Sequence, residues 1–487
     1  MHPKEKILPI FKKFVNFHNH IYGSSDYLQT YGIPRNVNDL DKHSLICFGA
    51  GLPSPISNID WILKVGKDGH KRRPKFRVNS IYGMSLAVEK GAGLASMSAT
   101  LGAIIPFSRH MPSGLVPVAL ADEGDWVTSL SKAGLRILND RPINAETPAH
   151  LLNDSVTPTP LHFVRNNGLM PDDRDKRKER LRIDGEVMSP TTFSIKELRE
   201  NFRPVKVALL LECGGNGRAA YNPPARGNQW TTGAVGNANW TGVPFRELLK
   251  AVGVKETAVY TAHYGTDVHA SGNPDKVVIS RGVPIEKAMK PDSILAFEMN
   301  GEPIPLTHGA PLRLVVPGWP GSASQKWLNR ISIRNQIHDG TKMKGKSYRV
   351  PNQPVAPGAE VENSDLRIIE AMPVKSLITN PKTGHEFMRQ EALLIQGHAW
   401  AGDRLVVKVE ISIDFGSNWQ RTHLKMPLNP GSWQDWSWAL NVPGPGYYEV
   451  WARATDDHGV TQPMVVPGWN PRGYLNNSAH RIAVIAT

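Results

Sequence analysis

Cysteine is nearly absent from this chain, which has 2 cysteines among 487 residues. Two cysteines permit at most one disulfide, and neither lies in the Cys-x-x-Cys-His sequence that attaches a c-type haem. We therefore expect no haem in this chain, and we expect any haem that works with it to be on a partner protein. Cys47 has no second thiol nearby in the sequence, so a buried structural role is expected for it.

Strongly apolar runs are also lacking. The uncharged stretch at residues 91–108 is rich in small and polar residues, too weakly apolar for a membrane-spanning helix. It follows Arg72-Arg73 and precedes Ala119-Leu120-Ala121, an order that resembles a twin-arginine export signal. We predict residues 1–125 to be an N-terminal extension with an export signal, and hence a periplasmic protein. The cytoplasm is the alternative, because the arginines lie far from residue 1.

A segregated basic surface is missing as well, although the net charge is +13. The basic residues are dispersed along the chain, and the densest charged cluster, residues 172–182, is mixed in sign. This distribution argues against nucleic acid as a partner. A positive field would instead attract a small oxyanion.

The remaining composition is that of a soluble globular protein of several domains, with 40% hydrophobic and 21% charged residues. Short strand patterns alternate with two predicted helices, residues 194–201 and 244–252, which indicates an α+β fold. After a proline-rich linker at residues 350–358, apolar and polar residues alternate from Val407 to Ile413 and again from Tyr448 to Ala452. Together with the tryptophan cluster at 433–438, this pattern predicts a β-sandwich of immunoglobulin-like type.

The most informative stretch is V-K-V-A-L-L-L-E-C-G-G-N-G-R, residues 205–218. An apolar run of this length closed by glycines predicts a buried strand, with Cys213 at its end. The glycines let backbone N–H groups approach a ligand, and the Arg218 guanidinium is a fixed cation beside the thiol. These residues indicate a metal and anion site, and the alternative is a buried cysteine next to a tight turn.

A nucleotide site is a second interpretation, because Gly215, Gly217 and Ala220 form a G-x-G-x-x-A sequence after a strand. That fingerprint requires a helix to begin at once, and Pro223-Pro224 oppose one. We therefore expect no nicotinamide cofactor.

Several further segments, in order, resemble the molybdenum-cofactor domain of the sulfite oxidase family. They are T-P-T-P-L-H-F-V-R-N-N-G (157–168), L-R-I-D-G-E-V (181–187), E-C-G-G-N-G-R (212–218), Q-W-T-T-G-A-V-G-N-A-N-W-T-G-V (229–243), A-F-E-M-N-G-E-P-I-P-L-T-H-G-A-P-L-R-L-V-V-P-G (296–318) and Q-K-W-L (325–328). From about Val361 onward the chain resembles the family's dimerisation domain. The resemblance implies a molybdopterin domain at residues 126–350 and a β-sandwich dimerisation domain at residues 360–487.

The resemblance also implies a set of site residues. Cys213 would supply a thiolate to molybdenum, Arg165 and Arg218 would face the substrate anion, and Trp230 would form a wall of its pocket. The molybdopterin would be held by a second set of side chains: Phe163, Arg165, Asn166, Asp267, His308, Arg313, Ser324 and Lys326. Arginine and lysine suit a phosphate, and the other polar groups suit ring nitrogens and amides.

This chain departs from the family pattern in three places. Asn167 stands where animal members have histidine. The Asp-Tyr expected just after the K-W-L sequence is absent, and the nearest tyrosine, Tyr348, is the candidate replacement. Ser417 stands where the family's D-G-G-R-x-W loop has arginine.

The function implied by the resemblance is oxidation of sulfite, or another small sulfur oxyanion, by a homodimeric enzyme. Electrons would pass to an external acceptor such as a c-type cytochrome. Two alternatives stay open. One is a sulfane dehydrogenase subunit that acts on carrier-bound sulfur, and the other is a secreted binding protein with a degenerate cofactor domain.

Overall fold

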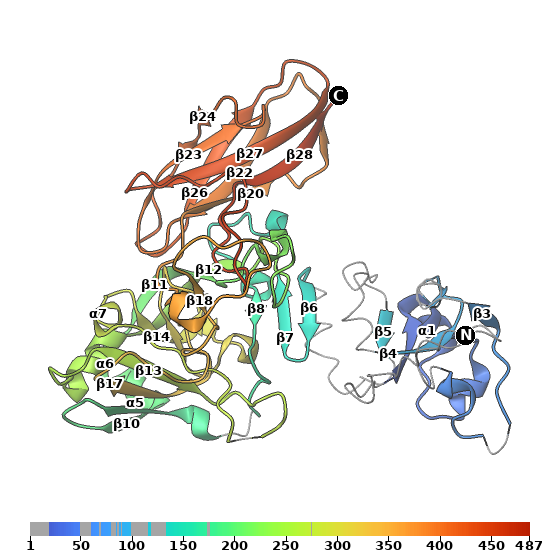
Figure 1. Cartoon of the computed structure of the whole chain (residues 1–487), viewed down its shortest axis with the longest axis horizontal. Helices are drawn as coiled ribbons and strands as arrows, with labels where there is room; N and C mark the ends of the chain where they lie inside the picture. The colour runs from blue at the N-terminus through green and yellow to red at the C-terminus, as the bar shows by residue number, and fades with distance from the viewer. Residues whose placement is uncertain are drawn as a thin grey trace, which may run out of the picture. The chain divides into compact units, whose positions relative to one another are not determined.

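The computed structural model describes residues 19–48, 60–67, 70–78, 84, 87–88, 90–98, 115–117, 133–172, 176–273 and 275–487 (Figure 1). The chain divides into two compact units, Met1–Trp126 and Val127–Thr487. Within the described residues, no helix is long and apolar enough to cross a membrane.

The described residues of the first unit include a five-stranded sheet and the short α-helix α1. The strand order is β3-β2-β4-β1-β5. The bounds are β1 Asn19–Ser24, α1 Ser25–Tyr31, β2 Leu45–Phe48, β3 Phe76–Val78, β4 Leu94–Ser98 and β5 Leu115–Pro117. Ser24 caps α1 by accepting a hydrogen bond from Tyr27 N. Cys47 is fully buried on β2, as expected for a structural residue.

Arg72, the first arginine of the predicted export signal, is a packed residue of this unit. Its Nε donates to Asp41 Oδ1 at 2.6 Å, and its guanidinium also donates to the carbonyl oxygens of Val37, Ile62 and Val65. Parts of the predicted apolar segment and all of Ala119-Leu120-Ala121 lie outside the described residues. Export and a periplasmic location therefore stay predictions.

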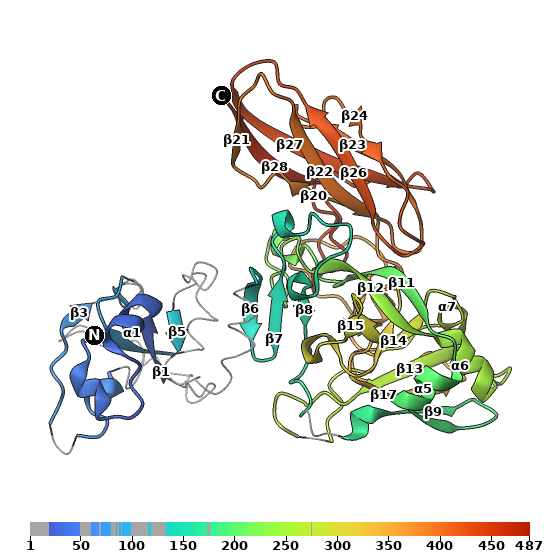
Figure 2. The ribbon, with the colours of Figure 1, turned by 180° about the vertical axis from the view of Figure 1, so that it is seen from behind.

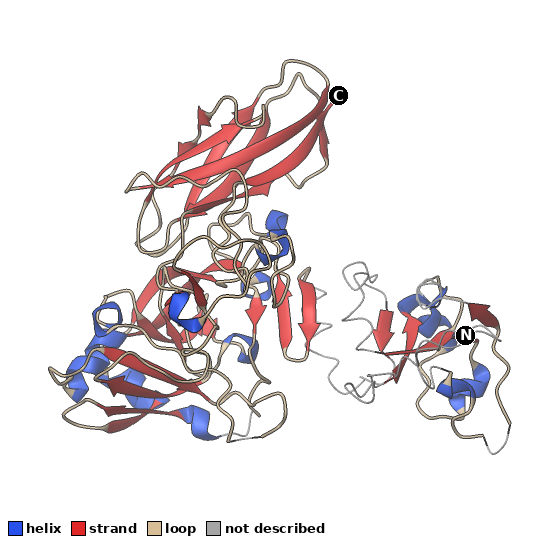
Figure 3. Ribbon diagram, viewed as in Figure 1, coloured by secondary structure: helices blue, strands red, loops and turns tan. Residues whose placement is uncertain are grey.

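The second unit begins with a mixed α+β region made largely of three sheets (Figure 3). The first sheet is β6-β7-β8, the second is β10-β9-β17-β13, and the third is β11-β12-β14-β15 with β16 paired to β14. The strand bounds are β6 Arg136–Asp140, β7 Ile143–Glu146, β8 Val164–Arg165, β9 Arg180–Gly185, β10 Thr191–Ser194, β11 Val205–Glu212, β12 Val235–Pro244, β13 Tyr260–Gly265, β14 Ile294–Met299, β15 Glu302–Pro303, β16 Arg313–Val315 and β17 Leu328–Arg334.

The two predicted helices are present, and their boundaries follow from local sequence. Helix α5, Ile195–Asn201, begins after Ser194, which forms a capping box with Glu197. Helix α6, Phe245–Val252, begins after Pro244 and turns four apolar side chains toward the core. A single-turn helix, α7 Ile285–Ala288, completes the set. Leu248, Leu249 and Val252 pack with residues of β9, β14 and β17 in one buried cluster.

The C-terminal region is a β-sandwich, shown from behind in Figure 2. One sheet has the order β20-β22-β26-β25, and the other has the order β21-β28-β27-β23-β24. The bounds are β20 Lys375–Asn380, β21 His385–Phe387, β22 Leu393–Trp400, β23 Val406–Ser412, β24 Gln420–Arg421, β25 His423–Leu424, β26 Gln434–Leu440, β27 Gly446–Asp456 and β28 His480–Ala486. The predicted linker is partly structured, because β18 Arg349–Pro351 pairs with β19 Leu366–Ile368.

One detail of the alternation in β23 was predicted incorrectly. Val409 and Ile411 are buried as expected, but Val407 is 46% exposed and Val406 is buried in its place. The cause is a register shift between Val406 and Lys408 in the pairing with β27. A β-bulge adds one residue and exchanges the two faces of the strand on either side of it.

Candidate active site

Cys213 is placed by the end of β11. This strand pairs with β12 from Val205 to Glu212 without a register shift, so the position of its last residue is fixed by the sheet. Cys213 N then donates to Ala234 O at 2.9 Å, and Asn216 N donates to Cys213 O at 2.8 Å, which closes a tight turn. The next residues form a short 3₁₀ turn, Arg218–Ala220, and then extended backbone at Tyr221. No α-helix follows Gly217, in agreement with the prediction against a dinucleotide site.

Glycine is required at position 215 by a close approach. A Cβ there would lie 2.3 Å from Arg218 Nη2. Such a contact is impossible, so any side chain at 215 would displace the arginine or open the turn.

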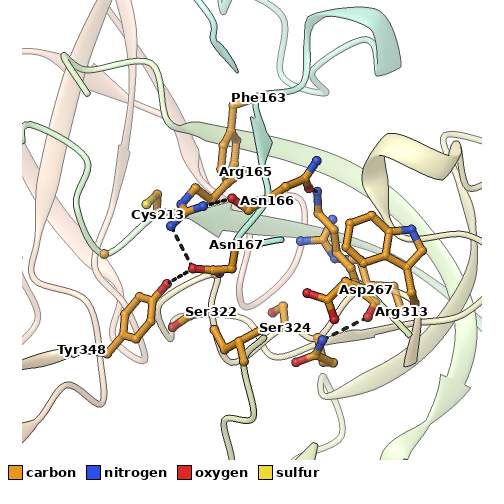
Figure 4. Close-up of a pocket in the computed structure, with 16 residues that line it drawn as sticks. Phe163, Arg165, Asn166, Asn167, Cys213, Asp267, Arg313, Ser322, Ser324 and Tyr348 are labelled. Carbon is orange, nitrogen blue, oxygen red and sulfur yellow. Dashed lines mark hydrogen bonds between the residues drawn. The ribbon is translucent and has the colours of Figure 1, made fainter. Parts of the chain in front are cut away.

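The Cys213 side chain lines a cavity that collects segments far apart in the sequence (Figure 4). Most of the lining comes from four segments, which are residues 163–167, the Cys213 turn, the 321–327 loop before β17 and the loop before β18, and Asp267, Ile279 and Arg313 complete it. The lining residues are Phe163, Arg165, Asn166, Asn167, Cys213, Gly214, Asp267, Ile279, Arg313, Gly321, Ser322, Ser324, Gln325, Lys326, Trp327 and Tyr348.

Two cations of this cavity are buried without a carboxylate partner among the described residues. Lys326 Nζ donates to Asn166 Oδ1 at 2.7 Å and to Thr307 O at 2.5 Å. Arg313 Nη1 donates to His308 O at 2.9 Å. Burial lowers the pKa of Arg313 to about 9, and burial together with Arg313 and Arg165 lowers the pKa of Lys326. Buried cations held only by neutral groups favour the binding of an anion such as a phosphate.

Several buried polar atoms around the cavity have no protein partner, which is the expected sign of a bound polar ligand. They include the donors Asn166 Nδ2 and Arg313 Nε and the acceptor Gln325 Oε1, with Ser322 Oγ able to act in either role. Leaving such atoms unpaired costs about 1–3 kcal/mol each. A group that presents both donors and acceptors, together with an anion, would satisfy them.

Asp267 is the only carboxyl group among the lining residues. Burial raises the pKa of Asp267 to about 6, although Lys342 and Lys326 oppose this rise. A carboxyl group with a pKa close to neutrality can accept a hydrogen bond from a ring N–H or donate one to a ring nitrogen.

The opposite end of the cavity is organised around Asn167. Its Oδ1 accepts hydrogen bonds from Arg165 Nη2 at 2.9 Å, from Lys342 Nζ at 2.8 Å and from Tyr348 Oη at 3.4 Å. Figure 4 shows the side chains of Arg165 and Tyr348 directed toward this amide. Three donors, one from the 163–167 segment and two from the loop between β17 and β18, therefore converge on one neutral oxygen.

Tyr348 is held by stacking. Its ring lies against that of Tyr474 with centroids 5.5 Å apart, and the Arg281 guanidinium lies 4.9 Å from the centre of the Tyr348 ring. The Arg218 guanidinium lies 5.1 Å from the centre of the Tyr474 ring, so a chain of ring and cation contacts joins Arg281, Tyr348, Tyr474 and Arg218. Tyr348 is thus a rigid element of the cavity, as a substitute for the family's tyrosine would have to be.

The structure brings together nine of the predicted site residues in the cavity lining: Cys213, Arg165, Phe163, Asn166, Asp267, Arg313, Ser324, Lys326 and Tyr348. His308 is buried behind the lining, where its ring packs 5.3 Å from that of His162. Trp230 is fully buried outside the lining and belongs to the same hydrophobic cluster as Phe163 and Cys213.

Arg218 also lies outside the lining. Its Nε donates to Arg472 O at 2.6 Å, and its Nη1 donates to Asn228 O at 2.9 Å. These contacts give it a structural role between the Cys213 turn and the C-terminal segment. Its predicted contact with a substrate anion stays a prediction.

Some residues of the site were missed by the sequence interpretation. Ser322, Gln325 and Trp327 belong to the quoted segments or directly precede them, so their position beside Lys326 was a usable signal. Lys342 and Arg281 had no such signal, because their importance depends on contacts with residues far away in the chain.

The fold and the site define an oxidoreductase that binds molybdopterin. Residues 167–342 match the oxidoreductase molybdopterin binding domain, and residues 366–487 match the Mo-co oxidoreductase dimerisation domain. The cofactor is therefore molybdenum-bound molybdopterin, and the unpaired cations and orphan polar atoms of the cavity fit it.

The chain belongs to the sulfite oxidase family. It is 34% identical over 367 residues to the sulfite oxidase of Gallus gallus, across 72% of this chain and 77% of that protein. It is 33% identical over 368 residues to the mitochondrial sulfite oxidase of Rattus norvegicus, across 72% of this chain and 65% of that protein. The chain thus spans about two thirds of the length of its mammalian relatives.

A solved structure agrees with this placement. The crystal structure of the sulfane dehydrogenase SoxCD from Paracoccus pantotrophus superimposes with a TM-score of 0.59 and 27% identity, over 72% of this chain and 88% of that one.

Proposed function

We propose that this protein oxidises sulfite to sulfate and passes the electrons to an external acceptor. The observation that carries the proposal is the position of Cys213, the single thiol of the second unit, on a cavity whose cations lack carboxylate partners. The names of the relatives in Gallus gallus and Rattus norvegicus support sulfite as the substrate.

The overall reaction fixes what the site must do. Sulfite gains one oxygen atom from water and loses two electrons, and two protons are released. The bound cofactor supplies the two-electron redox chemistry, and Cys213 would give its metal a soft thiolate ligand. Arg313 and Lys326 would bind the phosphate end of the cofactor, while Asn166, Asp267 and Gln325 would pair with its polar ring atoms.

The protein's own groups at the other end of the cavity would handle the anion. Arg165 and the Tyr348 hydroxyl donate toward the same point, and both line the cavity. Donors fixed before the substrate arrives bind an anion without a cost of reorganisation. We propose a one-electron carrier of the c-type cytochrome class as the acceptor.

A homodimer is part of this proposal. The match of residues 366–487 to a dimerisation domain supports it, and so do exposed apolar side chains on the sandwich, among them Met426, Leu428 and Val465. Sedimentation of the full chain at micromolar concentration should give twice the monomer mass.

The test of the function is sulfite-dependent reduction of ferricyanide and of cytochrome c by molybdenum-loaded protein. Reduction by wild-type protein, and none by Cys213→Ser protein with equal molybdenum content, supports the proposal. If free sulfite gives no reduction but a persulfide-bearing carrier protein does, the substrate is carrier-bound sulfur and the proposal is wrong.

A further inference from the structure

Lys342 has no ion-pair partner although it is largely removed from water. Its Nζ donates one hydrogen bond, to the neutral Oδ1 of Asn167, and it forms no ion pair with any described residue. An ammonium group carries three N–H donors. Two of them are therefore left for something other than the protein.

The shared acceptor makes the surplus of donors larger. Asn167 Oδ1 has two lone pairs, and it already receives donors from Arg165, Lys342 and Tyr348. An anionic oxygen placed among these donors would relieve the competition. The Asn167 amide would then hold the three donor groups close to one another, ready to bind the anion.

The surrounding charges favour the same occupant. Arg281, whose guanidinium lies 4.9 Å from the centre of the Tyr348 ring, is fully buried, and its Nε and Nη2 have no hydrogen-bond partner among the described residues. Arg165 forms its hydrogen bonds with Asn144, Asn166 and Asn167 and with no carboxylate. Burial lowers the pKa of Lys342, and Arg165 and Arg472 lower it further, against Tyr348 and Asp267. Bringing an anion into such a group relieves repulsion among the cations.

The backbone here also holds an unfavourable conformation. Lys342 has φ 63° and Tyr348 has φ 53°, and Trp327, another lining residue, has φ 48°. Residues other than glycine rarely adopt positive φ, and such strain concentrates at functional sites.

We infer that Lys342 is a specificity-determining residue that binds an anionic oxygen of the substrate together with Arg165 and the Tyr348 hydroxyl, with Asn167 as the positioning residue. The site would select a small, multiply charged oxyanion over a neutral sulfur compound. This inference rests on the proposed function and adds a residue to it.

The test compares Lys342→Met with Lys346→Met, which removes the same charge from an exposed lysine of the same loop. We expect Lys342→Met to raise KM for sulfite by about 10- to 150-fold, as for one lost charge-assisted hydrogen bond, with kcat nearly unchanged. Lys346→Met should match wild type. Lys342→Arg should restore a large part of the affinity because it keeps a cation.

A second readout is independent of turnover. Isothermal titration of the purified holoenzyme with inorganic sulfate should show weaker binding for Lys342→Met by a similar factor. Lys342→Asn, which tolerates positive φ, should behave in the same way and separates loss of charge from misfolding. Equal sulfate affinity in wild type, Lys342→Met and Lys342→Asn would overturn the inference, whether or not the protein oxidises sulfite.

Discussion

Two buried lysines of the second unit, Lys375 and Lys326, show how differently the two sides of the Cys213 turn are built. Lys375 Nζ lies 2.5 Å from Glu212 Oε1, and both side chains are almost fully buried. Lys326 is equally buried but contacts only neutral oxygens. Charge that is paired inside the protein supports the fold, whereas charge left unpaired is available to a ligand.

The paired side is supplied by the β-sandwich. Trp400 Nε1 donates to Glu212 Oε2 at 2.9 Å, and Asn216 Nδ2 donates to Glu212 Oε1 at 3.1 Å. Lys375 and Trp400 belong to β20 and β22, so the sandwich fixes the residue that directly precedes Cys213. The domain at residues 366–487 therefore also holds the base of the Cys213 turn.

The largest expected effect is a loss of activity caused by a substitution on the cavity side of the Cys213 turn. Cys213→Ser should abolish turnover while leaving the fold intact, because a serine oxygen is a harder ligand for molybdenum than a thiolate. Steady-state kinetics measures the loss of turnover, and circular dichroism checks that the fold is intact. Near-normal activity in a molybdenum-replete variant would contradict the assignment of the ligand.

The next largest effect is a loss of stability caused by a substitution on the sandwich side of the Cys213 turn. Lys375→Met leaves Glu212 buried without its cation and should lower the free energy of unfolding by about 3–5 kcal/mol. Lys326→Met is the matched control. It should change the stability of cofactor-free protein by only about 1 kcal/mol, because lost hydrogen bonds and relieved desolvation offset each other, but it should reduce the molybdenum content.

Urea denaturation of both cofactor-free variants measures this contrast. An equal loss of stability in the two proteins would contradict the claim that the Lys375 ion pair supports the fold while Lys326 is left for a ligand.

The third prediction uses pH on the cavity side. The pKa of Asp267 is raised from 3.8 to about 6 by burial, so the folded state binds the proton more tightly than the unfolded chain. The contribution of Asp267 to stability should therefore decline as pH rises from about 4 to about 6 and level off above that, by about 3 kcal/mol in total. Asp267→Asn removes this decline.

The measurement is the stability of the variant minus that of wild type, in cofactor-free protein at pH 4.5 and pH 7.5. A difference in favour of Asp267→Asn should grow with pH. A difference independent of pH would show that Asp267 titrates near its ordinary pKa.

The smallest predicted effect separates the two arginines of the site. Arg165→Met should raise KM for sulfite by an amount equivalent to about 1.5–3 kcal/mol, because Arg165 lines the cavity. Arg218→Met should mainly lower stability, because its guanidinium is hydrogen-bonded to backbone carbonyls. A larger KM change for Arg218→Met would place Arg218 in the anion pocket after all.

Local patterns explain how much of this was predictable. Strand β11, the helix starts at Ser194 and Pro244 and the missing helix after Gly217 all follow from residues close in sequence. Nine residues implied by the family resemblance line the cavity, and six of them lie in the quoted segments. The bulge near Val407 could not be predicted, because it depends on the register with β27. The orientation of the Arg218 side chain depends on its hydrogen bond to Arg472 O. The position of the Lys342 ammonium depends on its hydrogen bond to Asn167, which lies more than 170 residues away in the sequence.

The C-terminal segment gives the Cys213 turn a particular order of assembly. Leu475 N donates to Gly214 O at 3.0 Å, and Asn476 Nδ2 donates to Gly217 O at 2.8 Å. The turn itself is synthesised more than 250 residues earlier. While a ribosome is still translating the sandwich, the thiol therefore sits on an unfinished loop, and the cofactor can meet a complete cradle only after residue 476 has emerged.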